Sequence, residues 1–146
     1  MTTKQKQAIN TFKSNFNCAQ SVFSSFSDKF GLNKDTANSL TSGFGGGMGM
    51  LQKTCGAVTG AYMVISLYNS KIFIDNKDRK EKSAEMIQDF YDKFTAVNGT
   101  TNCKKLMNCD LNTEEGSKYA KEHNLFETVC EKCVSDSVII LEEMSI

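Results

Sequence analysis

Apolar side chains recur at steps of three and four residues along the first thirty residues of the chain. The residues with this spacing are Ile9, Phe12, Phe16, Ala19, Phe23, Phe26 and Phe30. The spacing predicts one long helix whose apolar side faces a protein core, and Gly31 is a typical residue to end it. Cys18 lies about 100° of helical turn before Ala19. It is therefore predicted to face sideways from the apolar stripe, toward a second neighbour or a site.

The rest of the chain also has helical character. No segment alternates with the period of a strand, and the chain contains no proline, the residue that most strongly interrupts helices. Further helices are predicted over residues 34–40, 55–69, 77–97 and 127–144, with two short ones that begin after Asn102 and Thr113. We therefore expect a single all-α domain over residues 1–146, a helical bundle with about four long helices and two or three short ones.

Capping residues and buried faces can be assigned to several of these helices. Thr54 is the predicted cap of the 55–69 helix, and Asn98-Gly99 ends the 77–97 helix. The predicted buried side of the 77–97 helix carries Ser83, Ile87, Phe90, Phe94 and Val97. The predicted buried side of the last helix carries Cys130, Val134, Val138 and Leu141, widened by Cys133 and Ile140. These faces follow from the helical repeat.

The segment between the predicted second and third helices is rich in glycine. Five of the seven residues from Gly43 to Gly49 are glycines, which implies unusual backbone angles or a close approach to another group. The segment has neither the G-x-G-x-x-G register nor the Gly-Lys-Ser/Thr end of a nucleotide-binding loop. Further along, Gly56 and Gly60 lie four residues apart, so another helix could pack closely there, within the chain or in a homodimer.

Charge and hydropathy exclude two classes of function. The chain has 17 Lys and Arg against 17 Asp and Glu, so it lacks the positive charge typical of nucleic-acid binding. The longest nearly apolar run, Cys55–Tyr68, is too short to cross a membrane. The first residues do not resemble a signal peptide, so we expect a cytoplasmic protein.

Cysteine is the residue type with the clearest functional potential. The chain has six cysteines in 146 residues, well below the content of small disulfide-stabilised proteins. Thiols stay reduced in the cytosol unless they bind a metal or take part in redox chemistry. Cys55 and Cys103 follow predicted helix caps, and Cys130 lies about one turn into the last helix. Because helix N-termini stabilise a thiolate, we expect these three thiols to be more acidic than a free cysteine.

Cys130-Glu131-Lys132-Cys133 is a C-x-x-C pair that shares one helix face. It could close a disulfide or hold a metal. No His follows it and no second C-x-x-C is present, which excludes haem attachment, a zinc ribbon and a bacterial ferredoxin. The only histidine, His123, lies at a predicted helix end, where a structural role is expected.

Several segments together resemble a family of redox-active proteins named for the pattern C_GCAxxG_C_C and known from anaerobic bacteria and archaea. The resemblance spans about residues 15–141. It is carried by the segments Asn17-Cys18-Ala19-Gln20, Gly45–Gly49, Cys55–Ala61, Cys103 and Cys130–Asp136. This chain has Cys55-Gly56 where the pattern has Gly-Cys, and Cys109 and Cys133 are additional to the family's four cysteines.

The resemblance implies a redox function for the family's four cysteines, which correspond to Cys18, Cys55, Cys103 and Cys130. Four thiolates are the ligand number of an iron–sulfur cluster, so our first hypothesis is an electron-transfer protein in which these thiols bind such a cluster or a related metal. Cys133 is a secondary candidate. The residues expected to bring main-chain amides near the cofactor are Gly45, Gly46, Gly47, Gly56, Ala57 and Gly60.

Two alternatives remain open at this point. One is a metal-free thiol–disulfide oxidoreductase that uses pairs of the same cysteines. The other is a helical interaction module with a structural zinc held by four cysteines, which would be colourless and needed for folding. A redox protein is the expected partner. The sequence does not distinguish an oxidoreductase from an electron carrier, and it does not identify a substrate.

Overall fold

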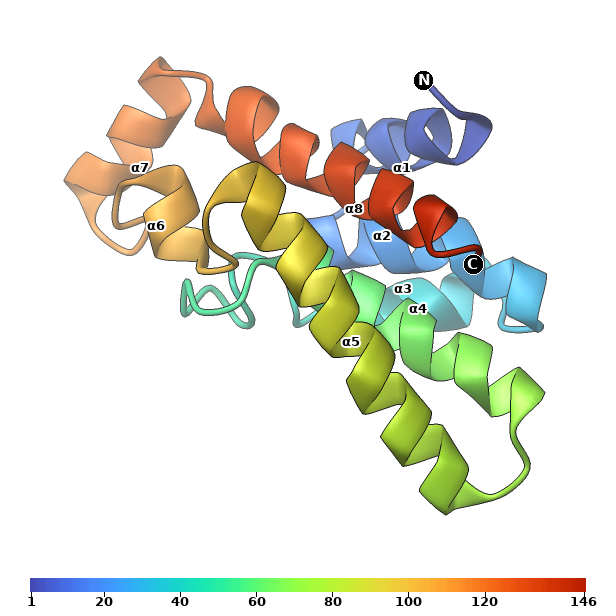
Figure 1. Cartoon of the computed structure of the whole chain (residues 1–146). Helices are drawn as coiled ribbons and strands as arrows, with labels where there is room; N and C mark the ends of the chain where they lie inside the picture. Colours follow the sequence, from blue (N-terminus) through green and yellow to red (C-terminus); the bar gives the residue numbers. More distant parts are fainter.

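A computed structural model of the chain describes residues 1–146, and every regular element in it is helical. The α-helices are α1 (Thr3–Lys13), α2 (Cys18–Ser27), α3 (Lys34–Thr41), α4 (Gly56–Ile72), α5 (Asn76–Asn98), α6 (Cys103–Met107), α7 (Glu114–Glu122) and α8 (Glu131–Glu143). A 3-10 turn, Asp28–Phe30, follows α2, and a π-helical turn, Phe126–Cys130, precedes α8. The predicted all-α bundle is confirmed (Figure 1). None of the helices combines the length and the hydropathy that a membrane span requires.

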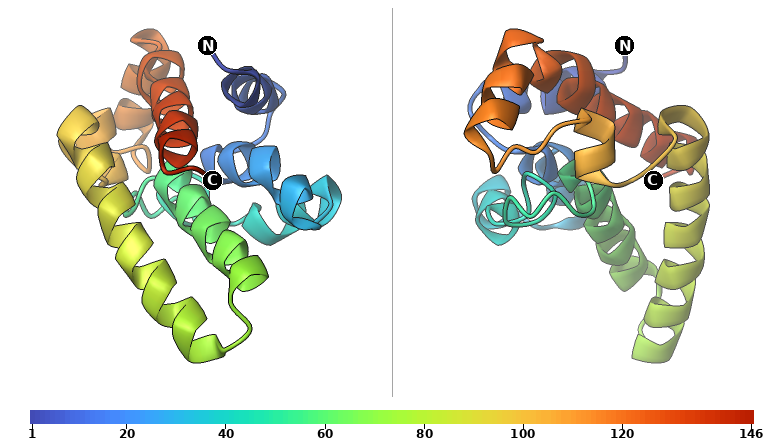
Figure 2. Two further views of the ribbon diagram at one scale, coloured as in Figure 1. Left: turned by 45° about the vertical axis from the view of Figure 1, so that its right-hand side comes forward. Right: turned by 90° about the vertical axis from the view of Figure 1, so that its left-hand side faces the viewer.

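Helices α2 and α4 pack against each other at the centre of the bundle. Helices α1, α3 and α8 also contact α2, while α5 lies along α4 and α8. Figure 2 shows α1, α2, α4 and α8 gathered around one core, with the far end of α5 extending beyond it. The short helices α6 and α7 lie at one end of the molecule, near the start of α4 and the loop before it (Figure 1).

The core is built from the faces that the helical repeat predicts. Phe90 and Phe94 of α5 are fully buried and stack with their ring centroids 6.1 Å apart. The predicted face of α8 is buried at Val134, Val138 and Leu141. Burial of such side chains supplies most of the free energy that favours folding.

The predicted first helix is wrong in one respect, because it is two helices. Helix α1 ends at Lys13, and Asn15 adopts a left-handed backbone conformation with φ 72°. Asn17 then caps α2: its side chain accepts a hydrogen bond from the Gln20 N–H, and the Gln20 side chain accepts one from the Asn17 N–H. This reciprocal cap satisfies donors that a continuous helix would not leave free.

The break changes the positions of two predicted residues. Phe16 lies in the connection and is 38% exposed, so it is not part of the core stripe. Cys18 is the first residue of α2 instead of a residue within a long helix. Cys18, predicted to lie on the side of a long helix, therefore lies at a helix N-terminus.

Three smaller predictions also need correction. Cys55 itself, and not Thr54, is the N-cap residue of α4. Val97 is 60% exposed, so the buried side of α5 does not continue past Phe94. The last helix begins with the π-helical turn, so Cys130 precedes α8.

The predicted close approach at the small residues of α4 is confirmed within the chain. A Cβ atom added to Gly60 would lie 2.8 Å from the Ala19 carbonyl oxygen, and one added to Gly56 would lie 3.2 Å from the Cβ of Cys18. Both distances are shorter than ordinary van der Waals contact. The glycines thus let the backbones of α2 and α4 approach, and this contact brings Cys18 next to the start of α4.

Candidate functional site

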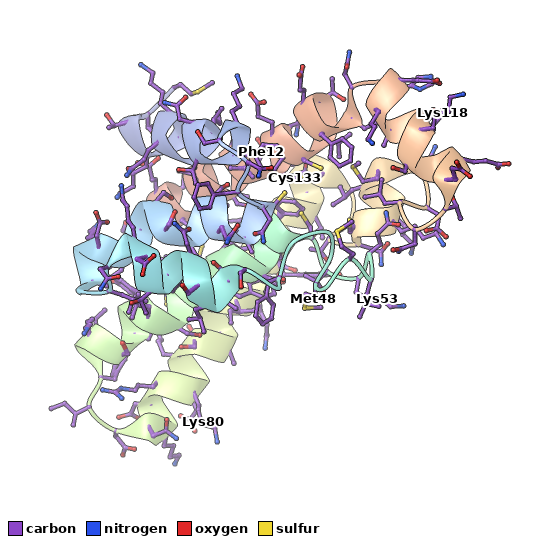
Figure 3. The ribbon with its side chains drawn as sticks, turned by 180° about the vertical axis from the view of Figure 1, so that it is seen from behind. Phe12, Met48, Lys53, Lys80, Lys118 and Cys133 are labelled. Carbon is purple, nitrogen blue, oxygen red and sulfur yellow. The ribbon has the colours of Figure 1, made fainter.

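Five of the six cysteines line one cavity at the end of the bundle. The cavity has a volume of about 200 Å³, and its cysteines are Cys18, Cys55, Cys103, Cys130 and Cys133. All six cysteines of the chain are free thiols. Figure 3 shows Cys133 beside Phe12, which also lines the cavity, above the loop that carries Met48 and Lys53. The five thiols come from α2, the start of α4, α6, the π-helical turn and α8.

The floor of the cavity is the glycine loop, residues 43–53. Gly46 and Gly47 line the cavity and have positive φ angles of 61° and 74°. The loop folds back on itself through main-chain hydrogen bonds, among them Gln52 N–H to the Gly46 carbonyl (2.9 Å) and Lys53 N–H to the Gly47 carbonyl (2.9 Å). A Cβ atom on Gly47 would lie 2.7 Å from the Cβ of Cys103. The unusual backbone predicted for this segment is confirmed, and it allows the loop to approach Cys103.

Cys55 and Cys133 form one pair of thiols. A hydrogen bond from Cys133 lowers the pKa of Cys55. Burial opposes this effect, while the main-chain N–H groups of Ala57 and Val58 add to it at the start of α4. The same contact with Cys55, together with burial, raises the pKa of Cys133 well above its usual range. The pair therefore resembles a thiolate at Cys55 that accepts a hydrogen bond from a protonated Cys133.

Cys18 and Cys130 form a second pair. The hydrogen bond with Cys130, followed by burial, raises the pKa of Cys18 well above that of a free thiol. The Cys130 thiol also lies 3.5 Å from the thioether sulfur of Met107. Cys130 is half-buried, whereas Cys18 is buried. The C-x-x-C residues Cys130 and Cys133 thus belong to different pairs.

Cys103 stands apart from both pairs, and the expectation that it is acidic is wrong. Burial raises its pKa to about 12, and the neighbouring Cys55 and Cys130 add to the rise. A hydrogen bond with the Gln52 side chain lowers it only in part. Helix α6 is a single turn of five residues, so its dipole does not offset the cost of burying a charge.

The other residues singled out in the sequence lie around the cavity or outside it. Gly56 lines the cavity with Gly46 and Gly47, whereas Gly45 packs against the Asn17 side chain. Ala57 contributes its N–H to Cys55, and Gly60 lies farther along α4 against α2.

Two potentially reactive side chains, those of Cys109 and His123, do not line the cavity. Cys109 is half-buried in the turn after α6, and its carbonyl oxygen accepts a hydrogen bond from the Gln52 side chain (3.0 Å). His123 ends α7 and stacks on Tyr119, as expected for a structural residue.

Three cavity features were not identified from the sequence. Met107 places a thioether sulfur next to the Cys130 thiol. The side chain of the buried Gln52 forms a hydrogen bond with Cys103. The Asn17 side chain donates hydrogen bonds to the Thr41 and Ser42 carbonyls and so joins α2 to the end of α3. The Asn17-x-x-Gln20 spacing is a capping-box pattern and could have revealed the start of α2. The roles of Met107 and Gln52 have no comparable signal, because they depend on contacts between distant segments.

Four of the five thiols in the cavity interact in two pairs, and Cys103 stands apart from them. No group of three or more His, Cys, Asp or Glu side chains is placed to hold a metal ion. A tetrahedral zinc site with Zn–S distances of about 2.3 Å needs four sulfurs within about 3.8 Å of one another. The residues as arranged therefore do not fit a structural zinc with four cysteine ligands. An iron–sulfur cluster spreads its thiolate ligands over several irons, and the kind and number of thiols fit that group.

Comparisons with known proteins give two matches. A family model described as "Putative redox-active protein (C_GCAxxG_C_C)" matches residues 16–144. An uncharacterized protein of Archaeoglobus fulgidus is 29% identical over 127 residues, which cover 81% of this chain and 83% of that protein. No solved structure matches the chain.

Proposed function

Because the chain belongs to the C_GCAxxG_C_C family of redox-active proteins, we propose that its cavity is a thiol–disulfide redox centre with Cys55 and Cys133 as the reactive pair. The observation that supports it is the contact between a thiol of lowered pKa and a thiol of raised pKa. This arrangement separates a nucleophile from a second thiol that keeps its proton. Oxidation of the thiolate and the thiol forms one S–S bond and releases two electrons and the proton of Cys133.

The reaction begins at Cys55. Its thiolate attacks one sulfur of an external disulfide, and the S–S bond of that disulfide breaks. The other half leaves as a thiolate, which takes from water the proton that Cys55 had lost. Cys55 is then held in a mixed disulfide and no longer carries the negative charge that contributes to the raised pKa of Cys133. Cys133 can now lose its proton and attack the sulfur of Cys55. The second half of the external disulfide leaves and takes up that proton, so the external disulfide becomes two thiols.

The second pair of thiols allows the centre to pass a disulfide on from Cys55 and Cys133. Cys18 and Cys130 are in contact, and Cys130 is three residues from Cys133 on the same segment. Exchange between the pairs would move a disulfide from Cys55–Cys133 to Cys18–Cys130, where the half-buried Cys130 is open to a redox partner protein. Thiols that take part in such exchange stay reduced in the cytosol, which is the location we propose.

The test is to oxidise the protein with a small disulfide and map the products by mass spectrometry. We expect a Cys55–Cys133 disulfide and a reversible two-electron potential in the range of cytosolic thiol couples. Cys55→Ser should stop disulfide formation at this pair, and Cys133→Ser should leave Cys55 as a trapped mixed disulfide. Cys109→Ser is the matched control, since Cys109 does not line the cavity. A Cys55→Ser variant that reacts like the wild type would contradict the assignment.

A second candidate is the iron–sulfur cluster, and the observation that favours it is the presence of all four family cysteines around one cavity. Cys18, Cys55, Cys103 and Cys130 would hold the cluster, and Gly46 and Gly47 would bring main-chain amides close to its sulfurs. When bound, such a cluster supplies one-electron transfer. The chain's own residues would then exclude water from it through the apolar walls of the cavity.

Cys103 separates the two candidates. Metal analysis and a visible spectrum of protein purified without oxygen should show iron and broad absorption if a cluster is bound, and Cys103→Ser should remove both. The thiol–disulfide centre predicts instead that Cys103→Ser reacts with disulfides like the wild type, because Cys103 belongs to neither pair. Zinc without colour would contradict both candidates and support the structural alternative.

A further inference from the structure

The walls of the cavity carry almost no polar groups. Sixteen residues line it, and none of them is a Lys, Arg, His, Asp or Glu. Apart from the thiols, only Asn17 has a polar side chain. Its oxygen accepts a hydrogen bond from the Gln20 N–H (2.8 Å), and its nitrogen donates to the Thr41 and Ser42 carbonyls (3.3 and 3.1 Å). Apart from the reacting Cys55 thiolate, no side chain in the cavity is left to pair with a charged ligand.

The opening of the cavity is also apolar. Met50 and Phe126 both line the cavity and are 49% and 38% exposed, so they connect it to the surface. They come from the glycine loop and the π-helical turn, and they are the two residues of the cavity lining whose side chains are exposed. We therefore assign the entrance of the cavity to these two apolar side chains.

The size of the cavity limits the ligand further. A cavity of roughly 150 Å³ holds a benzene molecule, and this one has about 200 Å³. A disulfide with two short aliphatic arms, or a small ring that contains an S–S bond, is of suitable size. A charged group brought into such a site loses its hydration, and only the reacting Cys55 thiolate is there to interact with it, so its entry is disfavoured.

We propose that the substrate of this centre is a small, uncharged aliphatic disulfide. The proposal rests on the thiol–disulfide function proposed above and adds the chemical class of the substrate. The S–S bond of the substrate enters the cavity, Cys55 attacks it, and its two halves leave as neutral thiols while Cys55 and Cys133 become a disulfide. Two electrons pass from the protein pair to the substrate. One product thiol takes the proton of Cys133, and the other takes from water the proton that Cys55 had lost.

The test compares three disulfides of nearly equal size. Bis(2-hydroxyethyl) disulfide is neutral, cystamine is a dication, and dithiodiacetic acid is a dianion. Each rate of Cys55–Cys133 disulfide formation is divided by the rate at which the same compound oxidises a small free thiol, which removes differences in intrinsic reactivity. We expect the neutral compound to react at least about tenfold faster than either ion, because the charged compounds must be desolvated.

A gain-of-function variant makes the test specific to the entrance. Met50→Lys places a cation at the opening and should raise the relative rate of the dianion. Leu51→Lys is the matched control, because Leu51 is adjacent and 67% exposed but does not line the cavity. An unchanged preference in Met50→Lys, with the neutral compound still favoured, would contradict the assigned entrance.

The remaining outcomes separate this proposal from the one on which it rests. Equal normalised rates for all three compounds would overturn the substrate class while the thiol–disulfide function stands. If no compound produces a Cys55–Cys133 disulfide, the proposed function fails and the substrate class fails with it.

Discussion

Cys55 accepts hydrogen bonds from one thiol and from two main-chain N–H groups in a buried site. Hydrogen bonding and the helix N-terminus together outweigh burial there, so the pKa of Cys55 is lowered. Cys103 lies in the same cavity with one polar neighbour, and burial raises its pKa to about 12. At the scale of the residue, reactivity is therefore decided by the number of donors that each sulfur receives.

The contribution of Cys133 can be measured directly. Cys133→Ala removes the hydrogen bond that most lowers the pKa of Cys55. A hydrogen bond to a charged group contributes about 1.5–3 kcal/mol, so we expect the first thiol ionisation to move up by roughly 1–2 pH units. The ultraviolet absorbance of thiolates, followed during a pH titration, reports this step. Cys109→Ala should leave the pH of this first ionisation unchanged. A Cys133→Ala titration identical to that of the wild type would show that the sulfurs of Cys55 and Cys133 do not interact.

At the scale of the element, the contact between α2 and α4 positions the site. Gly56 and Gly60 allow the two backbones to approach, and the Asn17 cap starts α2 at the level of Cys18. The apolar repeat identified α5 and α8 and most of their buried residues. It did not show the break between α1 and α2, because the spacing of apolar residues continues through the connection. The break itself comes from Asn15, which adopts a left-handed backbone conformation.

A substitution at Gly60 tests the close approach. Gly60→Ala should lower the free energy of unfolding by about 1–3 kcal/mol, although alanine favours helix formation, because its Cβ would lie 2.8 Å from the Ala19 carbonyl oxygen. Gly43→Ala is the matched control, since nothing lies within 4 Å of the added Cβ and its φ is not positive. Urea unfolding of both variants measures the difference. Equal stability of the two would mean that α2 and α4 can separate without cost.

At the scale of the whole molecule, the buried thiols link stability to pH. Cys18, Cys103 and Cys133 have raised pKa values, so the folded protein holds protons that the unfolded chain releases. The contribution of these protonated thiols to the free energy of unfolding is fully present below the unfolded thiol pKa of about 8.5. It is lost as the pH rises through the pKa values that the thiols have in the folded protein. The bundle is thus least stable in alkaline solution.

Urea unfolding under reducing conditions at a series of alkaline pH values measures this effect. We expect the free energy of unfolding to fall by up to about 1.4 kcal/mol per pH unit for each such thiol between pH about 8.5 and the folded pKa. For Cys103 the decrease should extend to about pH 12. Cys103→Ala should make the slope shallower, and a stability that does not change over this interval would show that the thiols ionise equally in both states.

Local patterns in the sequence predict the all-α fold and most helix ends, and they single out the cysteines that line the cavity. Periodic apolar residues report which face of a helix is buried, and capping residues report where it starts, and both are local properties. The same local patterns led to Cys130 and Cys133 as one C-x-x-C motif and to Cys103 as an acidic thiol.

The arrangement of the cysteines depends on the tertiary structure. Cys133 lies with Cys55 and Cys130 lies with Cys18 because α8 and the π-helical turn before it pass over the starts of α4 and α2. The pairing, the pKa of Cys103 and the lack of Lys, Arg, His, Asp and Glu side chains in the cavity lining all depend on contacts between residues far apart in the chain. No local pattern records those contacts, since the free energy of packing belongs to the assembled helices and not to any one of them.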